Sequence, residues 1–317
     1  MDLTVLGPPP PHRPGEIRVC AMVRDEAVRL PSFLRHHRAL GADRFIIVDD
    51  GSTDGTVELL AAQPDVHVVR SSAGFADRHG PVDWISHVLD AFCDGYWTLT
   101  VDADELFVFP GCERIGLRAA CEHFDAVGAE GVMALMIDMY GPGEVSATAH
   151  DPDARLLDTC PYFDPGPYRA VRTGLFPNVH FHGGPRMRLF DFSPYQERPP
   201  VLTKAPLVKW ERGRQYLLST HAVTPLRLYP MLAGLLHFKF LSDFHDRAIQ
   251  AVATGRHYGG SSEYRAYKDV MDRGGALRPR DDHSVRYLGT DQLVRLELMY
   301  ADAAFDALVA GRAAAQA

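Results

Sequence analysis

Five short apolar runs alternate with amphipathic segments between residues 17 and 139, and this alternation constrains the fold more than any other feature. The runs that we expect to form strands are rich in Val, Ile and Leu and comprise residues 17–23, 44–48, 66–69, 96–101 and 131–139. The helices expected between them are residues 30–40, 52–62, 82–93 and 113–127, the second capped by Ser52 or Thr53. Strands that alternate with helices at this spacing predict an α/β layered fold around a mainly parallel sheet.

The regular alternation ends after Tyr140. Residues 141–180 are rich in Gly, Pro and Asp, and an irregular stretch of this length is usually functional. The elements expected further on are strands at 187–190 and 207–210 and helices at 229–253 and 291–310. We therefore expect a single domain with an α+β second half, divided into a proline-rich arm outside the core (1–15), a first half (16–140), a second half (141–312) and a tail (313–317).

The composition excludes several classes of protein. A net charge of −8 argues against broad binding to nucleic acid or to an anionic membrane surface. No stretch approaches the ~18 apolar residues of a membrane span, and the N-terminus lacks a signal-peptide pattern, so we expect a cytoplasmic protein. The five cysteines include no Cys-x-x-Cys pair, which predicts reduced thiols and no zinc cluster.

The apolar run at residues 98–101 ends abruptly in Asp102-Ala-Asp104-Glu105. Strands of a parallel sheet are buried on both faces, so their ends are among the few places where carboxylates can meet a ligand. On an extended backbone, Asp102 and Asp104 would point to the same side. Two hard oxygen ligands at the carboxyl edge of a sheet suit a divalent cation that carries a phosphorylated substrate. A polar strand terminus or a helix N-cap is the structural alternative.

Two further polar segments follow the first and second expected strands. Arg24-Asp25-Glu26 comes after the first, and residues 49–56, Asp-Asp-Gly-Ser-Thr-Asp-Gly-Thr, come after the second. Adjacent parallel strands end at the same sheet edge, so both segments should face the edge that carries Asp102. There Arg24 is placed to meet a pyrophosphate and Asp50 to accept a hydrogen bond from a nucleotide base. A helix-capping turn is the structural interpretation of the same residues.

In this order and spacing, the segments that contain Arg24, Asp50 and Asp102 resemble the family 2 type of nucleotide-sugar glycosyltransferases, which have the GT-A fold. The resemblance covers residues 17–140 and extends more loosely through His237 to a bacterial subgroup. It implies a three-layer GT-A sandwich. Its first half would bind the nucleotide sugar, and its second half would bind the acceptor and complete the metal site.

The resemblance also implies roles for single residues. The aspartate matching Asp50 recognises the base, commonly uracil, and the pair matching Asp102 and Asp104 contacts the ribose and a Mn²⁺ or Mg²⁺ ion, with Asp104 as the direct ligand. A divalent ion on the diphosphate stabilises the charge that develops on the leaving group. The other residues expected in the nucleotide pocket are Arg24, Glu26 and Arg78. A solvated loop arginine is the structural alternative for Arg78.

GT-A enzymes commonly close the metal site with a late histidine, sometimes with a lysine on the phosphates. His237 and Lys239, in Leu-His-Phe-Lys-Phe, are the first choice for these two roles. An extended backbone would place both on one side, whereas the helix expected over residues 229–253 would place them on different faces. His221 is the alternative metal ligand. A hydrogen-bonded core or surface group is the structural alternative for either histidine.

Basic residues in the second half are candidates for anion binding. Arg186 follows Gly183-Gly184, which permits close backbone approach, and it is placed to contact the diphosphate or an anionic acceptor. Lys204 and Lys209 are further basic candidates, and at least one of them is expected to be a solvated lysine.

An inverting transfer needs a general base that deprotonates the acceptor hydroxyl, and the candidates are Asp138 and Asp191. We therefore expect a metal-dependent glycosyltransferase that moves a sugar from a nucleotide-diphosphate donor, UDP-linked, to the hydroxyl of a carbohydrate or other acceptor, with inversion. The alternative is a catalytically inactive nucleotide-sugar-binding or scaffold protein on the same fold. A dinucleotide-dependent oxidoreductase would need a Gly-x-Gly-x-x-Gly turn at residues 22–27, where no glycine is present.

Overall fold

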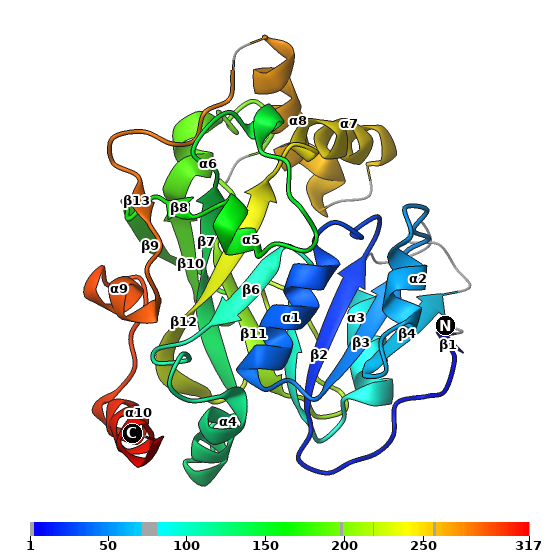
Figure 1. The fold of residues 1–317 in the computed structure, drawn as a ribbon, viewed down its shortest axis with the longest axis vertical. Coiled ribbons are helices and arrows are strands. Elements are labelled where there is room, and N and C mark those ends of the chain that lie inside the picture. The colour runs from blue at the N-terminus through cyan, green and yellow to red at the C-terminus, as the bar shows by residue number, and fades with distance from the viewer. Residues whose placement is uncertain are drawn as a thin grey trace.

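One large sheet with helices packed around it organises the chain (Figure 1). The computed structural model describes residues 3–71, 81–196, 199–217, 219–255, 258–274 and 276–316. The strands of the first half are β1 (Leu3–Leu6), β2 (Ile17–Val23), β3 (Arg44–Asp49), β4 (Val66–Ser71), β5 (Trp97–Thr100), β6 (Glu105–Val108) and β7 (Gly131–Tyr140). Those of the second half are β8 (Tyr162–Phe163), β9 (Tyr168–Arg172), β10 (Val179–Gly183), β11 (Thr203–Lys209), β12 (Leu228–Phe240) and β13 (Val285–Arg286).

The helices lie on the faces and at the two ends of this sheet. They are α1 (Leu30–Leu40), α2 (Thr56–Ala61), α3 (Pro81–Phe92), α4 (Leu117–Ala126), α5 (Leu156–Thr159), α6 (Gly184–Leu189), α7 (Phe244–Thr254), α8 (Tyr258–Asp272), α9 (Thr290–Arg295) and α10 (Ala303–Gln316), with a 3₁₀ turn at Val145–Ala147. In Figure 1, α7 and α8 lie at the top and α4 and α10 at the bottom. No helix in the described ranges combines the length and apolar character needed to cross a membrane.

The α/β GT-A-like architecture expected from the sequence is confirmed. The sheet order is β1-β4-β3-β2-β5-β11-β7-β12-β6, and β4, β3, β2 and β5 run parallel to one another. Every residue of β3 is buried, as expected for a strand covered on both faces. Because β11 pairs with both β5 and β7, the second half of the chain is built into the sheet and is not a separate appendage.

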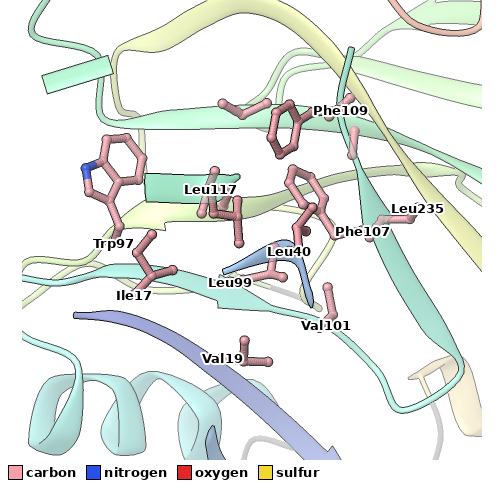
Figure 2. Close-up of a cluster of buried hydrophobic side chains, with 14 of the residues drawn as sticks. Ile17, Val19, Leu40, Trp97, Leu99, Val101, Phe107, Phe109, Leu117 and Leu235 are labelled. Atoms are coloured by element: carbon pink, nitrogen blue, oxygen red, sulfur yellow. The ribbon is translucent and has the colours of Figure 1, made fainter. Parts of the chain in front are cut away.

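A buried apolar cluster fixes the segment that contains the paired aspartates (Figure 2). Val101 precedes this segment and is 2% exposed, and Phe107 follows it and is fully buried. Both pack in one cluster with Leu99 of β5, Leu40 of α1 and Leu235 of β12 (Figure 2). Burying side chains of this size stabilises the fold by about 1.5–3 kcal/mol each, so the carboxylates between them are held by a rigid frame.

The expected helix over residues 229–253 is wrong in its first half. Residues 228–240 form the long strand β12, and only α7, Phe244–Thr254, is helical. β12 lies between β7 and β6 in the sheet, and side chains on both of its faces are buried, which is why its sequence is almost continuously apolar. Such a run cannot be distinguished from a buried helix by periodicity alone.

Four smaller expectations also differ from the structure. Residues 184–189 form helix α6, not a strand, with Pro185 in its first turn. The helix expected at 291–310 is interrupted because Tyr300 exchanges backbone hydrogen bonds of 3.0 and 3.1 Å with Leu232. The N-terminal arm, expected outside the core, contributes β1, which pairs with β4. Helix α2 begins at Thr56 after Gly55, not at Ser52 or Thr53.

Candidate active site

The Asp102–Glu105 segment is a tight turn and not the extended strand end that the sequence suggested. The Glu105 N–H donates to the Asp102 carbonyl at 3.0 Å, and the Asp102 N–H donates to the Glu105 carboxylate at 3.0 Å. The two aspartates therefore meet different partners. The Asp102 side chain is 54% exposed and contacts Lys204, whereas the Asp104 side chain is 18% exposed and contacts His237.

Lys204 of β11 holds the turn from the side of Asp102. Its Nζ donates to Asp102 Oδ2 at 2.7 Å and to Glu105 Oε1 at 2.6 Å, and the lysine is 1% exposed. Burial would lower the pKa of Lys204, but the two carboxylates outweigh it and raise that pKa. The lysine is therefore a fixed cation. The sequence marked it only as a basic candidate, because nothing in the pattern places β11 beside β5.

His237 joins the turn to β7. Its Nε2 lies 3.3 Å from Asp104 Oδ2, and its Nδ1 lies 2.6 Å from Asp138 Oδ1. Burial would lower the pKa of His237, but Asp104 and Asp138 raise it to about 9. A metal ion that binds Nε2 would displace a proton from this imidazole. The strand register fixes this contact, since His237 pairs with Glu105 of β6 on one side and with Asp138 of β7 on the other.

Arg186 continues the chain of charges beyond Asp138. Its Nε donates to Asp138 Oδ2 at 2.8 Å, and its Nη1 donates to Glu263 of α8 at 3.1 Å. Burial would raise the pKa of Asp138, but Arg186 and His237 lower it. Both oxygens of Asp138 are thus occupied, which suits a positioning role better than that of a proton acceptor. Arg186 is 4% exposed, so its expected contact with a diphosphate or acceptor has no support in this arrangement.

Lys239 lies on the same strand as His237, beside helix α8. Its Nζ is 3.4 Å from Glu263 Oε1 and sits 4.9 and 5.0 Å from the ring centroids of Tyr264 and Tyr267. The Tyr267 hydroxyl donates to the same Glu263 carboxylate. Lys239 was a candidate from the sequence. Glu263, Tyr264 and Tyr267 were not, because they lie in a helix that carries no recognisable motif.

Glu26 is buried and does not project into open space. Its carboxylate accepts from Arg247 of α7 and lies 3.4 Å from Arg29 Nη1. Arg29 in turn donates to both oxygens of Asp243 at 2.7 and 2.8 Å. This cluster, Glu26, Arg29, Asp243 and Arg247, ties the first βα loop to the start of α7. Arg29, Asp243 and Arg247 were not candidates from the sequence, because only their charge distinguishes them and they belong to no motif.

Arg24 and Asp50 meet at the ends of β2 and β3, as expected for neighbouring parallel strands. Arg24 Nη1 is 3.4 Å from Asp50 Oδ2, and their side chains are 46% and 18% exposed. The loop that carries Asp50 is shaped by Asp49, which accepts hydrogen bonds from Ser52 N at 3.0 Å and from Arg70 Nε at 2.9 Å. The accessible polar groups at this edge are therefore presented by an ordered turn.

Two further expected residues, His221 and Asp191, pair with groups outside the Asp102–Glu105 turn. His221 Nδ1 is 2.7 Å from the Thr203 carbonyl, and burial with the nearby Lys204 charge lowers the pKa of this histidine to about 3. Asp191 is exposed, and it accepts hydrogen bonds from Ser193 N at 3.0 Å and Ser193 Oγ at 2.7 Å. Arg78 lies outside the described residues.

The donor set allows a divalent cation that is shared with a substrate. In the described part of the chain, no group of three or more His, Cys, Asp and Glu side chains could hold a metal ion alone. Asp104 Oδ2 and His237 Nε2, 3.3 Å apart, nevertheless suit two ligands of one ion, with Asp138 orienting the other ring nitrogen. Mg²⁺ is commonly bound by one or two protein ligands together with substrate phosphates, so the residues fit such an ion.

Part of the first half of the chain is similar to a known protein family. Residues 19–128 match the family Glycosyl transferase family 2. No curated protein matches the chain.

Among solved structures, UTP-bound UGPase from Acinetobacter baumannii shares 8% identity, covering 81% of this chain and 82% of that one, with a TM-score of 0.26. A UDP-glucose pyrophosphorylase from Acinetobacter baumannii shares 11% identity, covering 81% and 83% of the two chains, with a TM-score of 0.25. Neither likeness carries an argument at these scores. The family match over residues 19–128, together with the mixed α/β sheet, supports a GT-A, family 2-like nucleotide-diphospho-sugar transferase.

Proposed function

We propose that the protein is a metal-dependent glycosyltransferase that moves a sugar from a UDP-linked donor to a hydroxyl group of a carbohydrate or other acceptor, with inversion. The observation that carries this proposal is the 3.3 Å approach of His237 Nε2 to Asp104 Oδ2. The pair lies after β5, at the sheet edge where Arg24 and Asp50 follow β2 and β3. A nucleotide bound along this edge would place its diphosphate near the two metal-binding candidates.

In this proposal Asp104 and His237 hold a Mn²⁺ or Mg²⁺ ion. When bound, the ion supplies stabilisation for the negative charge that develops on the leaving nucleoside diphosphate. Asp138 fixes the ring orientation of His237 through the 2.6 Å contact at Nδ1, and Arg186 holds Asp138 in place.

The nucleotide is held by residues that have polar groups at the sheet edge. Asp50 accepts from the base, and Arg24 lies beside it. Asp102 binds the ribose, with its carboxylate oriented by Lys204 at 2.7 Å. Lys239 contributes positive charge for the phosphates, although its contact with Glu263 shows that it is shared with α8.

Of the two candidates for the general base, Asp138 is better suited to orienting the His237 ring than to accepting a proton. Its two oxygens face Arg186 and His237, and its pKa is lowered by both. Asp191 has the more accessible carboxylate and stays the candidate base in this proposal. A test is the rate of sugar transfer by Asp191→Asn, which should fall by about 10²–10⁴-fold while UDP binding is kept. Unchanged turnover in that variant would remove Asp191 from the mechanism.

Calorimetry with UDP and Mn²⁺ tests the central claim. The wild-type protein should bind UDP only when the cation is present, and Asp104→Asn should lose this dependence. Asp158→Asn is a matched control, because Asp158 is an exposed aspartate paired with Arg155. Absence of metal-dependent UDP binding in the wild type would exclude the proposal. Binding without release of UDP from any UDP-sugar would favour a non-catalytic nucleotide-sugar-binding protein.

A further inference from the structure

Arg247 is a cation near the candidate metal site that the sequence did not single out. It lies in the first turn of α7 and donates to the Glu26 carboxylate, while its Nη1 is 3.8 Å from Asp243 Oδ2. Its side chain is 34% exposed, in contrast to 1% for the neighbouring Arg29. A guanidinium carries five N–H donors, so contacts with these two carboxylates leave donors for a further anion.

The fold brings Arg247 toward Asp104. Phe238 of β12 donates its N–H to the Asp104 carbonyl at 2.8 Å, and α7 begins six residues later at Phe244. Glu26, the partner of Arg247, follows β2, which is the parallel neighbour of the strand that leads into Asp104. Arg247 is thus tied to the loop after β2 and lies in the helix that follows β12, the two elements that flank the Asp104 segment.

We propose that Arg247 binds the diphosphate of the donor, with Glu26 and Asp243 holding its guanidinium in place. This inference rests on the proposed function, because a diphosphate at Asp104 is its premise. Arg29 is too buried to reach a ligand and instead anchors Asp243 through two hydrogen bonds. Arg247 is both anchored and accessible, which is the combination that planar, bidentate recognition of a phosphate requires.

A purely structural role for Arg247 makes a different prediction. If the arginine served only to neutralise buried Glu26, then removing either partner would disturb the site in the same way. If Arg247 binds phosphate, then Glu26→Gln should keep anion binding, because the Gln amide oxygen can still accept from Arg247 while the competing negative charge is removed. Arg247→Met should weaken anion binding. The affinity of Arg247→Lys for the anion should fall between those of Arg247→Met and the wild type.

The test is calorimetric titration with inorganic pyrophosphate and with UDP in Mg²⁺ buffer. Loss of charge-assisted hydrogen bonds in Arg247→Met should raise the Kd for pyrophosphate by about tenfold to a hundredfold. Arg273→Met is the matched control, since Arg273 lies at the end of α8 and is 79% exposed. The double variant Glu26→Gln/Arg247→Met removes both charges. It should show the same loss of binding without the buried Glu26 carboxylate having lost one of its two cationic partners.

The outcomes separate this inference from the proposed function. Pyrophosphate binding by Arg247→Met within twofold of the wild type would overturn the role of Arg247, as would equal losses in Glu26→Gln and Arg247→Met. If the wild type binds pyrophosphate but not UDP, the UDP donor is wrong and the role of Arg247 stands. If the wild type binds neither, both proposals fail.

Discussion

His237 Nε2 lies 3.3 Å from Asp104 Oδ2, although one residue precedes β6 and the other lies near the end of β12. The register of β12 with β6 sets this approach, because His237 is directly opposite Glu105. The same register with β7 places Asp138 at the other ring nitrogen, 2.6 Å away. A single imidazole therefore links the carboxylate of Asp104, in the turn before β6, to that of Asp138 on β7.

Replacing His237 with Gln should abolish the effect of Mn²⁺ on UDP binding, because the nitrogen that faces Asp104 is lost. Calorimetry with and without EDTA measures this directly. EDTA should weaken UDP binding by the wild type and leave binding by His237→Gln unchanged. A wild-type protein that binds UDP equally well in EDTA would contradict the prediction.

Asp138→Asn tests positioning against proton transfer. Loss of a carboxylate that orients a ligating histidine typically costs 10–100-fold in metal affinity, so metal-dependent UDP binding should weaken by about that factor. A residue that acted only as general base would lower turnover and leave UDP binding intact. Measuring turnover and metal-dependent UDP binding on the same variant distinguishes the two roles. Asp158→Asn is the control, because Asp158 is an exposed aspartate paired with Arg155.

Lys204→Met should destabilise the protein strongly. Removing this 1% exposed cation leaves Glu105, which is fully buried, without its partner, and breaking a buried pair costs about 3–5 kcal/mol. The free energy of unfolding in urea gives the measurement. Lys204→Met/Glu105→Gln should recover part of the loss.

The matched control for Lys204 is Lys209 on the same strand. Lys209 is 36% exposed and pairs with Asp125 at 2.7 Å, so Lys209→Met should cost no more than about 1 kcal/mol. Equal losses in the two lysine variants would show that burial of the Lys204 pair has no special effect.

Because of His37, we expect the free energy of unfolding to fall at mildly acidic pH. This histidine is fully buried between α1 and β6, and burial, followed by the charge of His36, lowers its pKa well below 6.5. The folded state therefore binds its proton less readily than the unfolded state. Stability is complete above pH 6.5 and falls as the pH drops below 6.5, toward the lowered folded-state pKa.

Urea unfolding at pH 7.5 and at pH 5.5 measures this effect. Each such histidine contributes up to about 1.4 kcal/mol per pH unit, and His37→Gln should reduce the difference between the two pH values. His36, whose pKa burial also lowers, accounts for part of what remains. An unchanged difference in His37→Gln would remove this histidine as the cause.

Much of the nucleotide-binding half could be predicted from the sequence, because its signals are local. Strands β2 and β3 are short, apolar and followed directly by Arg24 and Asp50, so the parallel order alone brings these residues to one edge. Strand β12 could not be predicted as a strand, because its two buried faces remove the alternation that distinguishes strands. The position of His237 and Lys239 on one side therefore depends on the extended backbone of β12, which the sequence alone does not specify.

The sequence by itself determined the layered α/β class, the edge at which the polar segments gather and the aspartates that face it, since these follow from apolar periodicity and parallel strand order. Only the tertiary structure decided which charges meet. Lys204 reaches Asp102 because β11 enters beside β5, and Arg247 reaches Glu26 because α7 packs against the first loop. Ion pairs between residues distant in the chain depend on strand order and helix placement, and these are set by the packing of the whole core.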